Sequence, residues 1–464
     1  MIIMKFGGTS VEDARAMKNV IDIVERERNR PPVVVVSAIS GATNTLLSAA
    51  ELALQGKIEE AVTSLNTLYE RHVLILENLI DTRSTVQMLI LDTRRRIDEL
   101  KHLCQSIAVL GELTKRSLDA IASVGERLSS LIIVEGMKER GLPAELVDAR
   151  KVIITDDQFT SAMPLFNYIE DTAKATIQSL LENNKIVVTQ GFIGSTTKGI
   201  TSTLGRGGSD YSAAILGSVL NAEEIQIWTD VDGVLTADPR IAPAAKKIKI
   251  LSFKEASELA YFGARVLHPS TILPAVKKNI PVVVLNSQRP NASGTQIVAN
   301  PPRSNVAVKA IASKKDITVI NIQSMRMLMA YGFLESIFSV FGKHKTSVDL
   351  VCTSEVAVSL TIDNTSRLDQ VVASLEEFAE VTVYEHKAIV CIVGEQMHST
   401  AGVADRIFRA LGDINAMMIS QGASEINMSL VINEQDVNEA VKRLHAEFFE
   451  PVPEMALFET IGTV

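Results

Sequence analysis

The opening residues IIMKFGGTS (2–10) decide the fold expected for the first part of this chain. An apolar run that ends at Lys5 and Phe6 predicts a buried strand, and Gly7 and Gly8 follow it at once. Consecutive glycines let backbone N–H groups approach an anion, and a lysine ammonium is a mobile charge suited to a phosphoryl oxygen. The stretch therefore indicates a phosphate-binding turn, although a tight strand–helix turn with a surface lysine explains it at least as well when it is taken alone.

Further apolar runs repeat this pattern up to about residue 300. They are VVVVSA (33–38), KIVVTQGF (185–192), IQIWTD (225–230) and VVVLNS (282–287). Most are continuously apolar rather than alternating, as strands buried on both faces of a parallel sheet are, and stretches with helical character lie between them. Residues 1–300 are therefore predicted to form one α/β domain with a mostly parallel sheet between helices.

Two parts of the chain depart from this alternation. From about 44 to 123 the pattern is almost purely helical, which predicts a helical insertion without chemistry of its own. After residue 300 the pattern changes to β-α-β-β-α-β and then repeats, which predicts two ferredoxin-like modules at 313–386 and 387–464. The join between the modules is the least defined boundary, and their segments could be interleaved.

The composition restricts the classes of function. With 464 residues the chain is long enough for two or three domains, and 46% hydrophobic and 22% charged residues are usual for a soluble globular protein. A formal net charge of −9 argues against nucleic acid or an anionic membrane as a partner, and no apolar run is long enough to span a bilayer. The three cysteines are too far apart for a metal site, and no signal peptide is expected, so a reducing cytoplasm is the predicted location.

A second glycine-rich stretch, TLGRGGSDYSAAILG (203–217), strengthens the case for an anion site. It places two glycines and a serine just before a predicted helix, where backbone donors and the positive end of the helix dipole converge. Arg206 is able to bind a carboxylate or a phosphate with two hydrogen bonds, and Asp210 is able to pair with a lysine and hold it in place. A helix cap alone would need neither the arginine nor so many glycines.

A third polar stretch, IWTDVDGVLTADPR (227–240), begins within a predicted central strand. The strand delivers Thr229 and Asp230 into a polar turn, and Arg240 ends the stretch. The spacing is not that of an EF-hand calcium loop. Hydroxyl, carboxylate and guanidinium groups at the end of a central strand suit a nucleotide and its magnesium ion, whereas alone the stretch would be interpreted as an Asp-rich surface turn.

A series of motifs in this chain resembles those of the aspartokinases, in the amino-acid kinase superfamily. They are KFGGTS (5–10), SAISGATN (37–44), SVGER (123–127), TLGRGGSDYSAA (203–214), WTDVDG (228–233), DPR (238–240) and FGARVLHP (262–269). The repeat that follows resembles the tandem ACT domains of this family, so the resemblance covers essentially the whole chain. It implies transfer of the γ-phosphoryl group of MgATP to the side-chain carboxylate of L-aspartate, giving 4-phospho-L-aspartate in the first step of lysine, threonine and methionine biosynthesis.

The resemblance also implies roles for individual residues. Lys5 and Gly8 would stabilise the transferring phosphoryl group, and Asp210 would orient Lys5. Arg206 would hold the α-carboxylate of aspartate and Glu126 its α-amino group. The whole aspartate pocket would comprise Ser37, Thr43, Glu126, Arg206, Gly207, Gly208 and Ser209. The ATP contacts would come from Lys5, Phe6, Gly7, Gly8, Thr229, Asp230, Leu235, Arg240, Arg265 and Val266.

Two of these positions differ from the usual pattern of the family. Leu235 stands where many relatives have a tyrosine, and Arg265 stands where a lysine is usual, so Val266 is expected to contribute through its backbone. No side chain is assigned as a metal ligand, because magnesium would be held through the ATP phosphates. No general base is expected either, since a side-chain carboxylate with a pKa of about 3.9 is already ionised at neutral pH.

Two stretches of the first repeat predict a site for an allosteric amino acid. The residues are Met327, Gly332, Phe333, Leu334, Ser347, Val348 and Asp349. The first group surrounds a predicted helix N-terminus, where free N–H groups receive a carboxylate, and Asp349 offers a carboxylate to a second amine. Both stretches resemble lysine-inhibited rather than purely threonine-inhibited aspartokinases, although threonine could act jointly. The ACT domains are expected to pair across a two-fold axis, which predicts a homodimer or a larger assembly.

Two alternatives remain for the function. Another amino-acid kinase, acting on glutamate or acetylglutamate, is disfavoured by SVGER (123–127) and by the tandem repeat. A catalytically silent amino-acid sensor with the kinase fold is disfavoured by the presence of Lys5, Arg206 and Asp210.

Overall fold

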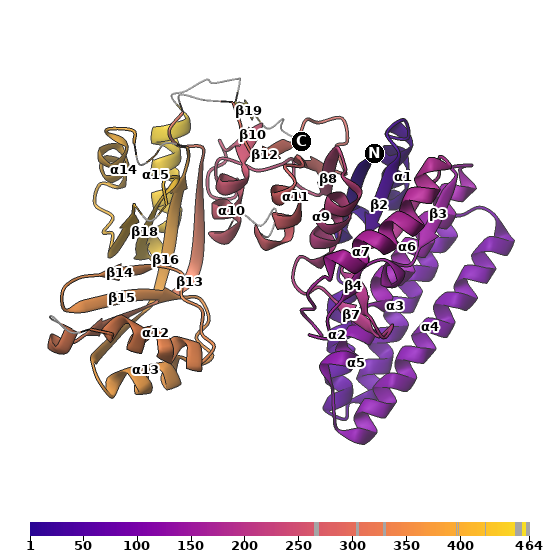
Figure 1. The fold of residues 1–464 in the computed structure, drawn as a ribbon, viewed down its shortest axis with the longest axis horizontal. Coiled ribbons are helices and arrows are strands. Elements are labelled where there is room, and N and C mark those ends of the chain that lie inside the picture. The colour runs from indigo at the N-terminus through magenta and orange to yellow at the C-terminus, as the bar shows by residue number, and fades with distance from the viewer. Residues whose placement is uncertain are drawn as a thin grey trace. The chain divides into compact units, whose positions relative to one another are not determined.

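The chain is divided into two compact units. The computed structural model describes residues 1–263, 269–302, 306–327, 331–395, 397, 399–422, 424–450 and 457–460, which Figure 1 shows as a ribbon. Unit 1 comprises Met1–Gly233, Ile250–Phe253 and Val266–Pro301, and unit 2 comprises Val234–Lys249, Lys254–Arg265 and Pro302–Val464. Two segments that precede residue 300 thus belong to unit 2.

Unit 1 is built on an eight-stranded sheet of order β10-β12-β11-β8-β1-β2-β5-β3. The strands are β1 (Ile2–Phe6), β2 (Pro32–Val36), β3 (Ala144–Val147), β5 (Ile186–Gln190), β8 (Glu224–Thr229), β10 (Ile250–Ser252), β11 (Val282–Asn286) and β12 (Thr295–Val298). Among the pairs of this sheet only β11 and β12 are antiparallel, so the carboxyl ends of the central strands meet at one edge. The predicted mostly parallel α/β fold is confirmed.

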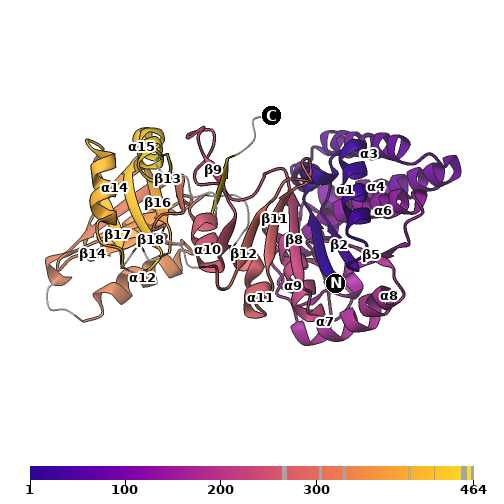
Figure 2. The same ribbon diagram turned by 90° about the horizontal axis from the view of Figure 1, so that it is seen from above.

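The central strands are continuously apolar because helices cover both faces of the sheet. Every residue of β1 and of β2 is buried. Figure 2 shows labelled helices on both faces of the sheet. On one face lie α1 (Ala14–Arg26) and α6 (Val124–Glu139), and on the other lie α9 (Gly208–Leu220) and α11 (Leu273–Lys277).

The predicted helical insertion consists of four helices. They are α2 (Ala42–Leu54), α3 (Ile58–Leu79), α4 (Arg83–Leu110) and α5 (Lys115–Ala122). Leu65, Leu76 and Ile97 on α3 and α4 join the same apolar core as residues of β1 and β2. The rest of unit 1 includes α7 (Phe166–Ala173), α8 (Ser179–Glu182) and a small sheet of β4 (Ile154–Thr155), β6 (Ile193–Thr196) and β7 (Thr201–Thr203).

Unit 2 is built on a six-stranded antiparallel sheet of order β14-β15-β13-β16-β18-β17. The strands are β13 (Ala310–Gln323), β14 (Val351–Thr353), β15 (Ala357–Ile362), β16 (Glu380–Val393), β17 (Met418–Gln421) and β18 (Asn427–Asn433). The helices that follow the β-α-β-β-α-β pattern are α12 (Phe333–Lys343), α13 (Leu368–Glu376), α14 (Val403–Leu411) and α15 (Val437–Phe449). The predicted ferredoxin-like repeats are thus present in this unit.

Two long strands, β13 and β16, run through both repeats. Residues 310–314 of β13 pair with 389–393 of β16, and 317–323 pair with 380–387. The first half of β13 therefore lies in the part of the sheet that belongs to the second repeat. The sequence predicts that a strand at 455–462 closes this repeat, but its described part, β19 (Phe458–Thr460), pairs with β9 (Lys246–Ile248) instead. A local apolar pattern identifies a strand but not its partner.

Most of α10 (Phe253–Tyr261) also belongs to unit 2. Glu255 on this helix forms an ion pair of 2.9 Å with Lys309, and both side chains are fully buried. Glu258 accepts a hydrogen bond from the Asn427 amide. These contacts hold α10 to the six-stranded sheet. Among the described residues, no helix is both long and apolar enough to cross a membrane.

Candidate active site

Lys5 and Asp210 form an ion pair at the centre of unit 1. Lys5 lies near the carboxyl end of β1, and Asp210 lies in the first turn of α9, which packs on β1. The Lys5 Nζ and Asp210 Oδ1 atoms are 2.6 Å apart, and both side chains are largely buried. The predicted catalytic lysine and its predicted orienting carboxylate are therefore in contact.

The two glycines after β1 allow a second loop to approach. The Gly7 N–H donates to the Trp228 carbonyl (3.0 Å), and the Gly8 carbonyl accepts from the Ser40 N–H (3.1 Å). A Cβ atom on Gly8 would lie 3.1 Å from the Ala38 carbonyl oxygen, which is closer than a side chain normally comes. The loop that contains SAISG (37–41) thus packs directly on the Lys5 loop.

Glu126 is buried close to this second loop. It lies in the first turn of α6, and a Cβ atom on the preceding Gly125 would be only 2.8 Å from that of Ala38. Burial raises the pKa of the Glu126 carboxyl to about 7, although backbone N–H groups of Glu126 and Ala38 oppose this shift. Its Oε2 atom has no hydrogen-bond partner among the residues that the structure describes, so this carboxyl is available to a cationic ligand.

Ser37 and Thr43 flank the same loop. Ser37 is half-buried, and its carbonyl accepts a hydrogen bond of 2.6 Å from the Ser129 hydroxyl on α6. Thr43 lies in the first turn of α2 and is also half-buried. The Ser129 contact shows how α6 holds the loop that carries Ser37 and leads into α2, where Thr43 lies.

The glycine-rich loop before α9 leaves Arg206 exposed. Gly205 and Gly207 have φ angles of 77° and 70°, in the left-handed region that favours glycine. A Cβ atom on Gly208 would lie 2.5 Å from the Phe192 ring, so this glycine permits close packing. Arg206 forms no ion pair with any described residue. Its guanidinium is therefore free to bind an anion, next to the helix whose first turn holds Ser209 and Asp210.

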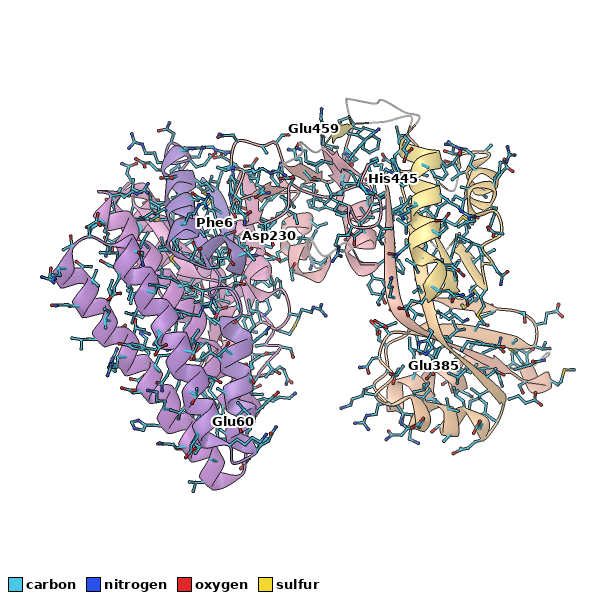
Figure 3. All side chains as sticks on the ribbon, turned by 180° about the vertical axis from the view of Figure 1, so that it is seen from behind. Phe6, Glu60, Asp230, Glu385, His445 and Glu459 are labelled. Carbon is cyan, nitrogen blue, oxygen red and sulfur yellow. The ribbon has the colours of Figure 1, made fainter. Side chains whose placement is uncertain are left out.

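The turn after β8 is held from the neighbouring strand β11. Figure 3 labels Phe6 and Asp230, which lie at the ends of the adjacent strands β1 and β8. The Thr229 hydroxyl donates to Asp230 (3.0 Å). Asp232, in the same turn, accepts from the Asn286 amide (2.8 Å) and pairs with Arg289. Thr229 and Asp230 thus lie at the carboxyl edge of the sheet, as the sequence predicts.

The other predicted ATP contacts lie outside unit 1 or outside the described residues. Leu235 and Arg240 belong to unit 2. Arg240 is exposed and binds Asp238 through three hydrogen bonds of 2.7 to 3.2 Å, which lower the pKa of the Asp238 carboxyl. Arg265 and Val266 lie outside the described residues.

The predicted effector residues lie around one end of the first repeat. Gly332 is the N-cap of α12 with a φ of 81°, and Phe333 and Leu334 form its first turn. Met327, Phe333 and Val348 pack against one apolar cluster, whereas Ser347 is exposed. The structure therefore brings several of these residues together in unit 2.

Asp349 differs from expectation, because it already has partners. Its side chain is only 2% exposed, and Oδ1 accepts hydrogen bonds from Lys314 Nζ (3.0 Å) and the Tyr261 hydroxyl (2.7 Å). Sequence reasoning missed both partners, as it missed Asn286 and Arg289 beside Asp232. Asn286 ends β11, a neighbour of β8, and Arg289 follows it, so the rule that parallel strands share a carboxyl edge could have identified both.

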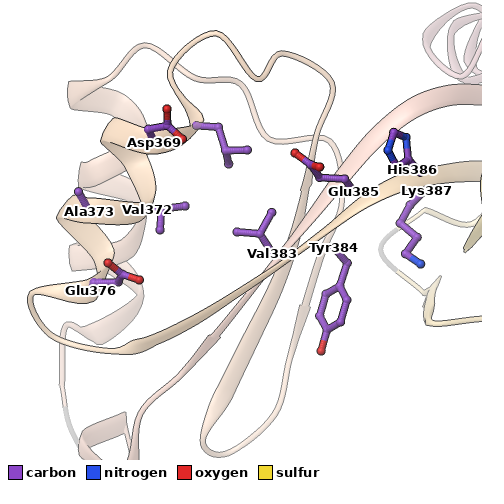
Figure 4. Close-up of a pocket in the computed structure, with 10 residues that line it drawn as sticks. Asp369, Val372, Ala373, Glu376, Val383, Tyr384, Glu385, His386 and Lys387 are labelled. Atoms are coloured by element: carbon purple, nitrogen blue, oxygen red, sulfur yellow. The ribbon is translucent and has the colours of Figure 1, made fainter.

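A separate pocket of about 720 Å³ lies between α13 and β16 in unit 2 (Figure 4). Asp369 and Glu376 line it from the helix, and Val383, Glu385 and Lys387 from the strand. None of the predicted effector residues belongs to its described lining. Among the described residues, no group of three or more His, Cys, Asp or Glu side chains is arranged to hold a metal ion.

The chain matches two known protein families. Residues 1–286 match the amino acid kinase family, and residues 390–448 match the ACT domain. Two curated relatives are similar over nearly the whole chain. The lysine-sensitive aspartokinase 3 of Escherichia coli is 38% identical over 467 residues, covering 97% of this chain and 99% of the relative. The chloroplastic aspartokinase 3 of Arabidopsis thaliana is 40% identical over 468 residues, covering 97% of this chain and 81% of the relative.

Solved structures show the same similarity. The structure of E. coli aspartokinase III in complex with aspartate and ADP, described as the R-state, has a TM-score of 0.85 at 37% identity. The complex of the same enzyme with lysine and aspartate, described as the T-state, has a TM-score of 0.81 at 37% identity. Each comparison covers 97% of this chain and 100% of the solved chain.

Proposed function

This chain belongs to the amino-acid kinase family and is an aspartokinase, and on that premise we propose which residues carry out its reaction. An aspartokinase transfers the γ-phosphoryl group of ATP to the side-chain carboxylate of L-aspartate. The single observation that best supports our assignment is the Lys5–Asp210 ion pair of 2.6 Å, placed at the edge of a parallel sheet between two glycine-rich loops.

Catalysis is proposed to depend on charge and position rather than on a general base. The attacking carboxylate is already ionised, and the difficulty is that an anion must approach a polyanion. Lys5, held by Asp210, places its ammonium on the transferring phosphoryl group, and Gly7 and Gly8, which lack side chains, let that group approach the backbone. The aspartate oxygen forms a bond to the γ-phosphorus as the bond to the ADP oxygen breaks.

The aspartate substrate is proposed to lie between the loop at 37–41 and the glycine-rich loop before α9. Arg206 binds the α-carboxylate, because it is an exposed cation without an ion-pair partner among the described residues. Glu126 binds the α-amino group, because its buried carboxyl has an unpartnered oxygen. The remaining contacts are assigned to Ser37, Thr43, Gly207, Gly208 and Ser209.

The nucleotide is proposed to bind beside the end of β8. Thr229 and Asp230 lie there, Phe6 ends the adjacent strand β1, and Gly7 and Gly8 follow it. The E. coli enzyme has been solved with ADP, which supports ATP as the phosphoryl donor. Magnesium would be held through the ATP phosphates, where it would neutralise charge. Leu235, Arg240, Arg265 and Val266 stay predictions from the sequence.

Lysine is the proposed feedback inhibitor. The E. coli relative is named lysine-sensitive, and one of its structures contains lysine. The N-terminus of α12 at Gly332 would receive the carboxylate of the effector, and Asp349 would receive an amine. Threonine, alone or jointly, is the competing effector. Inhibition assays with each amino acid distinguish them.

We further propose a cytoplasmic homodimer, or a larger assembly, that catalyses the first step of lysine, threonine and methionine biosynthesis. The dimer would form through residues beyond about 310, because paired ACT sheets cover exposed edge strands. β14 and β17 are the edge strands of the six-stranded sheet. Light scattering at micromolar concentration should give at least twice the mass of one chain, and a stable monomer would contradict this proposal.

The reaction itself is tested with hydroxylamine, which traps an acyl phosphate as a hydroxamate. The purified chain is incubated with MgATP and, separately, with aspartate, glutamate or acetylglutamate. Hydroxamate should form with aspartate. Formation with glutamate or acetylglutamate in place of aspartate would favour another amino-acid kinase, and no product with any acid would favour a silent sensor.

A further inference from the structure

Asp119 is a buried carboxylate in the helical insertion, to which the sequence assigns no chemistry. It lies on α5, and only 1% of its surface is exposed. Its oxygens accept hydrogen bonds from the Thr160 N–H (3.0 Å), the Thr203 N–H (2.9 Å) and the Thr203 hydroxyl (2.7 Å). Both partners lie outside the insertion, so one side chain joins three separate segments of unit 1.

The segment that Asp119 holds leads directly into the glycine-rich loop. Thr203 is the last residue of β7, and Arg206 follows it after only two residues. The Thr203 carbonyl accepts from the Ala162 N–H (2.9 Å), and the N–H of the next residue, Leu204, donates to the Phe192 carbonyl (2.9 Å). The start of the loop is therefore held on every side, and the Asp119 carboxylate supplies two of the contacts.

Thr160 supports the same loop from a strained conformation. Its φ of 73° is in the left-handed region, which a β-branched residue rarely adopts. Its carbonyl oxygen lies 3.2 Å from the position that a Cβ atom on Gly205 would take. The turn at Thr160 thus packs against the beginning of the glycine-rich loop, and the hydrogen bond to Asp119 helps to hold that turn in place.

We propose that Asp119 is a positioning residue for the acceptor substrate, which acts by fixing Thr203 and Thr160 and thereby the place of Arg206. The inference rests on the proposed role of Arg206 as the ligand of the aspartate α-carboxylate. Asp119 touches no reacting atom and acts only through the loop. Its loss should therefore weaken aspartate binding more than ATP binding.

An ionised carboxylate suits this place because it only accepts hydrogen bonds, and all three groups that face it are donors. In Asp119→Asn, an NH₂ group replaces one carboxylate oxygen, so that a donor faces the N–H and O–H donors of Thr160 and Thr203. At least one buried N–H or O–H then loses its acceptor, and the loop must shift to relieve the mismatch. A shift of ~1 Å at a substrate-binding group is enough to lower kcat/KM by up to about 100-fold.

The test is steady-state kinetics of the full-length Asp119→Asn, Thr203→Val and Thr203→Ser variants. The KM for aspartate should rise about 10-fold in the first two, while kcat and the KM for ATP stay within about twofold. Thr203→Ser keeps the hydroxyl and should behave as the unaltered enzyme. Asp92→Asn is the matched control, because Asp92 binds Arg95 and Arg96 within α4 and should leave the KM for aspartate unchanged.

The possible outcomes distinguish a failure of this inference from a failure of the proposed role of Arg206. If Asp119→Asn and Thr203→Val lower the melting temperature but leave the KM for aspartate within twofold, Asp119 is purely structural and the inference is overturned. If Asp119→Asn does not fold, the Thr203→Val and Thr203→Ser pair makes the same decision. If Arg206→Ala leaves the KM for aspartate unchanged, both the role of Arg206 and this inference are overturned. If Arg206→Ala raises the KM while Asp119→Asn and Thr203→Val leave it unchanged, only the inference is overturned.

Discussion

The two units each contain a lysine–aspartate ion pair, and the two lysines differ in how fully they are paired. Lys5 Nζ in unit 1 lies 2.6 Å from Asp210 and has no other carboxylate partner among the described residues. Lys314 Nζ in unit 2 lies 3.0 Å from Asp349 and 2.8 Å from Asp363. An ammonium has three donors, so after these contacts Lys5 retains two donors for a phosphate, whereas Lys314 retains one. This difference is what the proposed role of Lys5 in binding a phosphoryl group requires.

Lys314 also forms an ion pair with Asp349, the residue whose carboxylate we propose as a ligand of the effector. Burial alone would lower the pKa of its ammonium, but hydrogen bonds to Asp363 and Asp349 outweigh burial, and the pKa is raised. The ammonium also lies 5.0 Å from the centre of the Tyr261 ring. Lys314 therefore stays protonated, and an effector lysine would have to displace it from Asp349.

The largest effect is expected at Lys5. Lys5→Ala should lower kcat by about 100- to 1000-fold with a much smaller change in the KM for aspartate, because a preorganised charge on the transferring phosphoryl group is lost. Lys138→Ala, which removes a surface lysine paired with Glu135, is the control in the same assay. Near-normal turnover in Lys5→Ala would show that the Lys5–Asp210 ion pair has only a structural role. It would contradict the proposed functional difference between Lys5 and Lys314.

The next largest effect is expected at Arg206, an exposed cation of unit 1 without an ion-pair partner among the described residues. Arg206→Ala should raise the KM for aspartate by about 10- to 100-fold, since hydrogen bonds to charged groups contribute about 1.5–3 kcal/mol. Initial rates measured against each substrate provide the check. A change confined to the KM for ATP would place Arg206 in the other pocket.

Glu126 sharpens the comparison through pH, because it has no ion-pair partner among the described residues, whereas Asp349 pairs with Lys314. Its pKa of about 7 lies above the ordinary value of 4.5, so it is neutral in the free enzyme below pH 7. An ammonium needs the ionised form, and the KM for aspartate should therefore rise up to about 10-fold for each pH unit below 7. Glu126→Gln should have a high KM at every pH, and a flat profile in the unaltered enzyme would contradict the assignment.

The same shift has a consequence for stability with the opposite direction in pH. The folded protein holds the Glu126 proton more tightly than the unfolded chain does, so Glu126 makes the free energy of unfolding fall as pH rises from 4.5 to about 7. Glu126→Gln stays neutral and should lose this contribution. Thermal unfolding of both proteins across this range measures the difference, and parallel curves would argue against a buried titrating carboxyl.

The smallest effect is expected at Lys314. Lys314→Met should lower the lysine concentration for half-inhibition by about 3- to 10-fold, because a competing ion pair of about 1 kcal/mol is removed from Asp349. Asp349→Ala should weaken lysine inhibition instead. If lysine inhibits both variants as it inhibits the unaltered enzyme, Asp349 does not bind the effector. The Lys314–Asp349 ion pair would then have no role in regulation.

The central strands could be predicted from sequence, whereas the partners of Asp349 could not. Buried parallel strands are continuously apolar, so the run at 2–6 coincides with β1 and the run at 282–287 extends β11 by one residue. Lys5 and Asp210 could be assigned because each lies next to a glycine-rich motif. Tyr261 and Lys314 reach Asp349 from distant segments, and no local pattern encodes such a contact. The position of β19 was missed for the same reason.

The shared strands β13 and β16 have a consequence for how this protein could be engineered. Each crosses from one repeat into the other without a break in its backbone. Neither repeat can therefore be excised or exchanged as a cassette, because a cut at their sequence border removes half of a central strand from its neighbour. A chimaera with a different effector specificity would have to replace 310–450 as one piece. The two repeats should also unfold together as a single cooperative block.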